Sequence, residues 1–432
     1  MSFLAKSLSA PVLSLIFARV LYAINWFNIS SIFYLILIDF RQDVSMLGLV
    51  TASFLLGIGI FQVPAGILAA KYDPKKIAAF GIMMLSISSL LSGLATELFQ
   101  IAILRFLVGV GMAFFFGPSV ILISAYLGKG SDGLGVGILN SAHSLGGIIG
   151  LFGWIVIAQN VGWRASLIFG GILGIVTGIL LIYGLKQKRQ QQQQQQHDGD
   201  KDNGHLQHPL HNDFKLRAND KEHGTQQSDF KIKLSDLRLV LINKQMIIVG
   251  LSLLGIQIGW NLVSTFVVLY LKNDLHASPY FAGMVAGLAM VLNVVFAPIF
   301  GRIYDKTTRM RNRNLGLILL IVCGVVVSVN IALFSLENIY VIVLSIMMIG
   351  IFISGGFVVP YTKAREIAII KLNQRHYETL AVSFVNGLSL FGAFWVPFVF
   401  SIVVLYFGYP TAWMIGGFLT ILFIIPIVKL AV

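Results

Sequence analysis

Long uninterrupted apolar stretches make up most of the chain, and short polar or basic segments separate them. Several stretches exceed the roughly 18–20 residues that a helix needs to cross a bilayer. The pattern predicts six membrane-spanning helices, a long polar interval and six more helices, at residues 12–38, 46–70, 77–95, 98–127, 134–158, 165–185, 246–271, 280–303, 314–335, 339–361, 377–406 and 411–428.

The composition supports this pattern and excludes a water-soluble globule. Hydrophobic residues are 57% of the 432, and charged residues only 11%, against about 25% charged in a typical soluble domain. We therefore expect an all-α polytopic membrane protein with two pseudo-symmetric six-helix bundles. Residues 1–185 form the first, 186–245 a linker and 246–432 the second. The first stretch lacks a small-residue cleavage site followed by a mature domain, so it is expected to be retained.

The net charge of +13 records topology rather than a nucleic-acid partner. Basic residues cluster in every second gap between the apolar stretches, and the gaps in between hold only Arg41, Arg164 and Lys272. Short basic loops mark the cytoplasmic side of a membrane, so both termini and the linker are expected in the cytoplasm and the protein in the plasma membrane. The other basic residues cluster in alternate gaps: Lys71, Lys75, Lys76, Lys129, Lys186, Lys188, Arg189, Arg302, Lys306, Arg309, Arg311, Arg313, Lys363, Arg365, Lys371 and Arg375.

The two halves repeat each other in sequence. Gly66 corresponds to Gly301 and Asp39 to Asp274 at a constant offset of 235, and Asn140 corresponds to Asn386 at an offset of 246. Parallel repeats of six spans characterise a common transporter architecture, whose substrate site lies near the membrane midplane between the halves.

The linker begins KQKRQQQQQQQHDGD and stays polar, so it is expected to be disordered, with a short membrane-surface helix at 230–243. Its histidines admit a metal-binding interpretation, but Pro209 interrupts any helical face and a solvated linker is favoured. With one cysteine, Cys323, no disulfide or metal framework is expected. The histidines concerned are His197, His205, His208, His211 and His223.

Four motifs together resemble the major facilitator superfamily. They are GILAAKYDPKK at 66–76, RFLVGVGMA at 105–113, GWRASLIFGG at 162–171 and GRIYDKTTRMRNR at 301–313. The resemblance covers the chain apart from the linker and implies a secondary transporter that works by alternating access, without a cofactor.

The motif at 301–313 and its first-half counterpart at 66–76 form loops that also suggest a latch between the halves. A carboxylate at a helix end can accept charge-assisted hydrogen bonds from basic groups or helix N-termini. In the first half Ala70 occupies the acid's position and Asp73 stands where the family has glycine, which leaves that latch in doubt. Ordinary loop solvation is the alternative for Asp73 and Asp305. The candidate gating residues are Gly66, Asp73, Gly301, Arg302, Asp305 and Lys306.

Polar side chains inside the spans are candidates for lining the pathway, since such groups normally face the bundle interior or a wet cavity. Hydrogen bonding between helices is the alternative. Arg19 lies near a span end and is expected to reach the interface and be structural. His143 is either a neutral bonded group or a proton or anion site. The candidate substrate-binding residues are Tyr22, Asn25, Trp26, Arg105, Asn140, His143, Gln257, Trp260, Asn261 and Asn386.

The distribution of charge predicts the substrate. No acid lies well inside a span, whereas Arg105 and His143 do, so a cationic cavity that favours a small organic anion is expected. The expected partners are this substrate, the bilayer, and a proton or counter-anion as the coupled species, with no nucleic acid. Efflux of amphipathic metabolites or drugs and a non-transporting membrane sensor are the alternatives. An enzyme is not expected, because a catalytic pair is lacking and no GxxxxGK[ST] motif occurs.

Overall fold

The computed structural model describes residues 9–42, 46–128, 130–202, 234–309, 313–371 and 377–431. The described residues form helices joined by short connections, with no strand among them. The helices of the first half are α2 Ala10–Phe40, α3 Met46–Lys71, α4 Pro74–Ser92, α5 Leu98–Leu127, α6 Asp132–Ile148, the π-helix η1 Ile149–Gly153, α7 Trp154–Val161 and α8 Trp163–Asp202.

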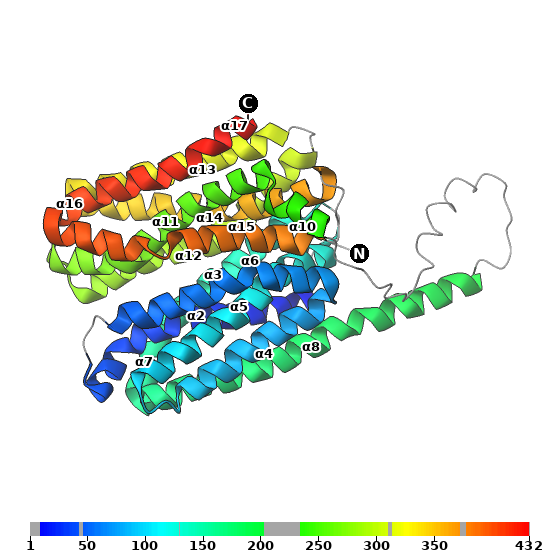
Figure 1. Ribbon diagram of the computed structural model, residues 1–432, viewed down its shortest axis with the longest axis horizontal. Helices are drawn as coiled ribbons and strands as arrows, with labels where there is room; N and C mark the ends of the chain where they lie inside the picture. Colours follow the sequence, from blue (N-terminus) through cyan, green and yellow to red (C-terminus); the bar gives the residue numbers. More distant parts are fainter. Residues whose placement is uncertain are drawn as a thin grey trace.

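The second half is built in the same way after a short helix, α10 Leu234–Leu241. Figure 1 shows α2–α8 as one group of helices and α11–α17 as a second group beside it. The second half contains α11 Lys244–Asn273, α12 Pro279–Arg309, α13 Arg313–Ala332, η3 Leu333–Leu336, α14 Ile339–Glu366, η4 Ile367–Lys371, α15 Glu378–Ala393, α16 Val396–Ile424, η6 Ile425–Ile427 and α17 Val428–Ala431.

The count of membrane crossings agrees with the sequence pattern. Eleven helical stretches in the described part of the chain are long and apolar enough to cross a membrane, and the last of them runs from Glu378 to Leu430. Gly408 interrupts that stretch with a non-helical φ of 78°. It therefore contains two crossings, and the twelve predicted spans in two bundles are confirmed.

The sequence repeat is also present in the backbone. Gly162 and Gly408, which the offset of 246 relates, have positive φ values of 84° and 78°. Arg41 and His276, which the offset of 235 relates, lie in the left-handed region at 52° and 53°. Non-glycine residues rarely adopt this conformation, so its recurrence at matched positions shows that the halves share their turns as well as their helices.

The linker differs in part from the prediction of disorder. Helix α8 continues past residue 185 through the glutamine tract to Asp202 (Figure 1). Glutamine is a good helix former, and extending an existing helix avoids the cost of nucleation. Helix α10 agrees with the short helix predicted at 230–243. Residues 203–233, with four of the linker histidines, lie outside the described residues.

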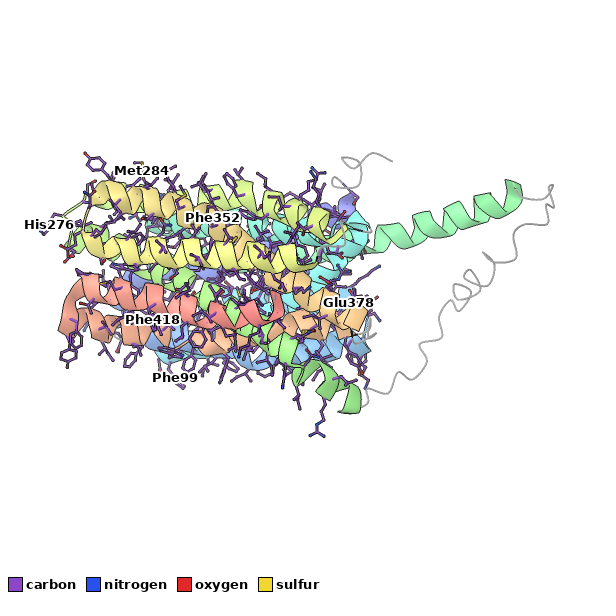
Figure 2. All side chains as sticks on the ribbon, turned by 90° about the horizontal axis from the view of Figure 1, so that it is seen from above. Phe99, His276, Met284, Phe352, Glu378 and Phe418 are labelled. Carbon is purple, nitrogen blue, oxygen red and sulfur yellow. The ribbon has the colours of Figure 1, made fainter. Side chains whose placement is uncertain are left out.

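The two ends of the bundles differ in charge. Lys71, Lys75, Lys363 and Arg365 lie at one end, called the basic end here. Figure 2 places Glu378 at this end and His276 at the opposite end. The sides between the ends carry exposed apolar side chains that point outwards, as the labelled Phe99, Met284 and Phe418 do (Figure 2). Such a band suits contact with lipid hydrocarbon.

The most extensive contacts between the halves are those of α6 with α12 and of α3 with α15. Small residues let these backbones approach closely. A Cβ atom on Gly301 of α12 would collide with the carbonyl oxygen of Gly133 on α6, and one on Gly66 of α3 would lie 2.8 Å from the Cβ of Ser383 on α15. Both predicted gating glycines therefore lie at the contact between the bundles.

Candidate functional site

A cavity of about 70 Å³ lies between the bundles, and both halves contribute to its wall. Eight of the ten predicted substrate-binding residues line it, and Asn25 and Arg105 do not. The lining residues are Arg19, Tyr22, Trp26, Phe27, Phe116, Asn140, His143, Ser144, Gln257, Trp260, Asn261, Ser264, Asn293, Phe357, Tyr361, Asn386 and Leu390.

The repeat explains how polar residues from both halves reach one cavity. Three pairs of lining residues are related by the two offsets, namely Tyr22 with Gln257, Trp26 with Asn261 and Asn140 with Asn386. Equivalent helices in the two halves present equivalent positions to the space between them. The cations break this symmetry, because the counterparts of Arg19 and His143 are Leu254 and Ser389.

Arg19 is the arginine of this cavity. Its side chain is buried at 5% exposure, and its guanidinium carbon lies 4.3 Å above the ring of Tyr22 and 4.8 Å above that of Phe116. Its Nε and Nη1 atoms have no hydrogen-bond partner among the described residues. Sequence reasoning placed it near the membrane surface, but α2 begins at Ala10. Arg19 is therefore nine residues into the helix, about 13 Å from its start.

Arg105, the predicted anion ligand, has a different environment. It is 2% exposed, and its Nη1 donates a hydrogen bond to the backbone oxygen of Asn25 at 2.8 Å. Its guanidinium carbon lies 4.6 Å from the ring of Phe54. The Nδ2 of Asn25 in turn donates to the backbone oxygen of Leu21 at 3.1 Å. Arg105 and Asn25 thus connect α5 to α2 beside the cavity rather than within its wall.

His143 lies in the cavity wall among three aromatic rings. The ring centroids of Tyr22, Trp26 and Phe27 are 5.9, 5.8 and 5.7 Å from that of the imidazole. The Nδ1 atom of His143 has no hydrogen-bond partner among the described residues. An imidazole nitrogen of this kind is available to a proton or to a ligand.

The second half supplies mainly amide and hydroxyl groups. The hydroxyl of Tyr361 donates to Oδ1 of Asn386 at 2.7 Å, and Ser144 Oγ donates to Oδ1 of Asn293 at 3.1 Å across the interface. Sequence reasoning missed Tyr361 and Asn293. The lone asparagine in the apolar span 280–303 was the available signal for Asn293, whereas Tyr361 falls at the predicted end of its span.

A latch of the predicted kind joins the halves at the basic end. Asp305 of α12 accepts hydrogen bonds from the backbone nitrogens of Gly133 and Leu134, at 2.8 and 3.0 Å. These nitrogens belong to the first turn of α6, where backbone groups lack helical partners and the helix dipole favours a negative charge. Arg302 and Lys306, also predicted to gate, are exposed on α12.

Further ion pairs at the basic end were missed from the sequence. Arg365 of α14 pairs with Asp132 of α6, and its Nε donates to Glu378 of α15 at 2.6 Å. Asp132 and Glu378 are themselves related by the offset of 246, which was the signal that would have found them. The arginine therefore connects the two halves at equivalent helix starts.

The first half has no equivalent carboxylate contact at Ala70. Asp73 instead caps its own helix, since its Oδ1 accepts from the backbone nitrogen of Lys75 at 2.9 Å. Ala70 lines a cavity of about 700 Å³ at the basic end, together with Arg365 and Thr379. The start of α15, which faces this space, has no side-chain cap. The carboxylate latch seen in the described residues is therefore one-sided.

Two pseudo-symmetric bundles that enclose a polar cavity are the architecture of a class of polytopic membrane proteins that includes secondary transporters. The chain belongs to the Major Facilitator Superfamily, whose family model matches residues 15–368 and 249–432. The fold is shared with the proton:xylose symporter XylE, with a TM-score of 0.72 at 17% identity, covering 98% of this chain and 95% of that one.

Curated relatives match over shorter regions. The 4-hydroxybenzoate transporter PcaK of Pseudomonas aeruginosa is 28% identical over 149 residues, which is 34% of this chain and 33% of PcaK. The probable sulfoacetate transporter SauU of Cupriavidus necator is 30% identical over 157 residues, 36% of each chain. The membrane sensor protein UhpC of Escherichia coli is 28% identical over 152 residues, 34% of this chain and 33% of UhpC. The chain thus matches about a third of the length of these relatives, which are transporters or a sensor rather than enzymes.

Proposed function

We propose that the protein is a secondary transporter that moves a small organic anion across the membrane by alternating access. The observation that carries this proposal is Arg19, a buried cation in a cavity with no acidic side chain among its described lining residues. A buried charge is costly unless it is paired. An anionic substrate supplies the missing partner, whereas a cationic substrate would be repelled.

The neighbouring groups would orient such an anion. Nε and Nη1 of Arg19 are available for charge-assisted hydrogen bonds, which are stronger than bonds between neutral groups. The amides of Asn140, Gln257 and Asn261 can bond the remaining polar atoms of the substrate, and the rings of Tyr22 and Trp26 can pack against its apolar part. The names of PcaK and SauU support this substrate class, since 4-hydroxybenzoate and sulfoacetate are both organic anions.

We further propose that the basic end faces the cytoplasm of the cell, because basic loops are retained on that side. The latch between Asp305 and α6 and the Arg365 ion pairs then close the cytoplasmic end. Breaking these contacts is required for release into the cell. Rocking of one bundle against the other around the cavity would open that end.

The direct experiment compares uptake of labelled benzoate, 4-hydroxybenzoate and acetate by proteoliposomes of wild type, Arg19→Gln and Arg238→Gln. Arg238 is exposed on α10 and serves as the matched control. We expect Arg19→Gln to lower uptake at least about 30-fold, since losing a charge-assisted bond and leaving a buried group unpaired costs about 2–3 kcal/mol. Equal uptake by Arg19→Gln and Arg238→Gln would overturn the proposal.

A non-transporting sensor is the second candidate, favoured by the match to UhpC. The linker distinguishes the two functions. Under the transporter proposal, a protein that lacks residues 203–233 still takes up the anion, whereas a sensor would lose its output and show no uptake in either form.

A further inference from the structure

A second cavity adjoins the central one towards the opposite end of the bundles. Its volume is about 250 Å³, against about 70 Å³ for the central cavity. It lies between η1 and α7 of the first half and α11 and α12 of the second. Apart from two serines and Trp260, its wall is apolar among the described residues, with Phe152, Val263, Val267 and Met290 as main contributors.

The two cavities share one helix face. Trp260 and Ser264, which lie one turn apart on α11, line both of them. These two side chains are therefore common to the walls of both cavities. The ring of Trp260 also meets that of Phe357 on the central side, with the centroids 6.5 Å apart.

An irregular stretch of backbone forms one wall of the second cavity. Leu151 and Phe152 belong to the π-helix η1, a form that occurs mainly as single turns and frequently at functional sites. Ser31 of α2 donates a hydrogen bond to the backbone oxygen of Gly150 at 3.1 Å. Opposite, Gly287 of α12 lacks a side chain, and a Cβ there would lie 3.2 Å from the Phe152 ring.

We propose that the second cavity, the apolar side pocket, receives the hydrocarbon or aromatic end of the transported anion while its charged group lies against Arg19. This inference rests on the proposed function and makes the substrate an amphipathic monoanion. The central cavity provides the charge but little volume, and the side pocket provides volume without charge. One molecule occupies both when the side chains of Trp260 and Ser264, which the two walls share, move aside.

Straight-chain carboxylates test this assignment directly. Dissociation constants for acetate, butyrate, hexanoate and octanoate are measured by calorimetry on purified full-length protein. Burying one methylene contributes enough free energy for an affinity gain of about fourfold. We expect roughly this gain per methylene from butyrate to octanoate, and the gain should be absent for the uncharged methyl esters, which cannot pair with Arg19.

Two glycine variants locate the effect. Gly287→Leu fills the side pocket, so it should remove the gain for hexanoate and octanoate while acetate affinity stays within about twofold of wild type. Gly153→Leu is the control. Gly153 follows Phe152 in η1, and the heavy atom nearest to a Cβ at Gly153 would be 3.7 Å away. If Gly287→Leu is poorly folded, Gly287→Ala should give a smaller loss with the same dependence on chain length.

The outcomes separate the two proposals. If wild type binds no carboxylate of any length, the proposed function fails. If it binds acetate and octanoate equally, or if Gly287→Leu weakens all four acids to the same degree, the side pocket holds a lipid chain or another occupant and this inference is wrong.

Discussion

At the scale of single residues, the two buried arginines of the first half have opposite roles in this account. Arg105 is bonded to the backbone of Asn25 and stays out of the cavity, while Arg19 lies in the cavity with two nitrogens available. The sequence pattern predicted Tyr22, Trp26 and His143 in the cavity wall, where the structure has them. It also predicted Arg105 there and Arg19 near the membrane surface, whereas Arg19 is the arginine that lines the cavity. Depth in the membrane depends on where α2 begins, and a side chain's direction depends on packing between helices, which spacing alone does not specify.

The first prediction separates these roles. Arg105→Gln should lower the free energy of unfolding by about 1–3 kcal/mol, because it removes a buried charge-assisted hydrogen bond. Its anion affinity should stay within about threefold of wild type. Thermal unfolding and calorimetry in the same detergent measure both quantities. A protein of normal stability that no longer binds anions would return Arg105 to the binding site.

The second prediction concerns His143, because imidazole is the side chain in the cavity wall whose ordinary pKa lies nearest to neutral pH. Protonation adds a positive charge that Arg19 opposes in the empty cavity and that a bound anion favours. Tyr22 and Tyr361 are the other ionisable side chains among the described residues of the cavity wall. Anion affinity should therefore rise as pH falls from 8 to 5.5. In His143→Gln it should change far less over this range. The same pH profile in both proteins would make His143 structural.

At the scale of helices, α6 and α12 approach closely at the basic end, where the carboxylate of Asp305 joins them. The glycine closing a span and the acid that follows predicted this latch in the second half. The Arg365 network was not predicted, because ion pairs between distant loops depend on which helix ends meet in space. The sequence did not decide whether the first half has a latch, and in the structure Asp73 caps α4.

The third prediction tests the latch. Asp305→Asn should favour opening of the basic end by about 1–2 kcal/mol, a shift of about 5- to 30-fold in the equilibrium. Electron–electron double resonance between spin labels at Lys76 and Leu315, in a Cys323→Ser background, measures the distance distribution. We expect a longer-distance population in Asp305→Asn. Asp73→Asn, whose carboxylate serves its own helix, should leave the distribution unchanged, and equal distributions in all three proteins would exclude the latch.

At the scale of the whole molecule, the repeat explains both the fold and the limits of the sequence prediction. The apolar pattern and two offsets were sufficient for twelve spans in two bundles, because membrane crossing and repeat symmetry are properties of the chain's pattern. The asymmetry that gives the cavity its charge depends on Arg19 and His143, which have no charged counterparts in the second half. Symmetry predicts where the lining lies and leaves its chemistry to individual substitutions.

The proposed function is that the protein transports organic anions through this cavity. The most direct measurement is uptake by wild-type proteoliposomes of a labelled panel: benzoate and 4-hydroxybenzoate, a neutral sugar such as xylose, and a lipophilic cation such as tetraphenylphosphonium, each against protein-free liposomes. We expect protein-dependent, saturable uptake of the carboxylates, inhibited by one another and little affected by the sugar. Saturable uptake of the cation or the sugar without uptake of either carboxylate would contradict it.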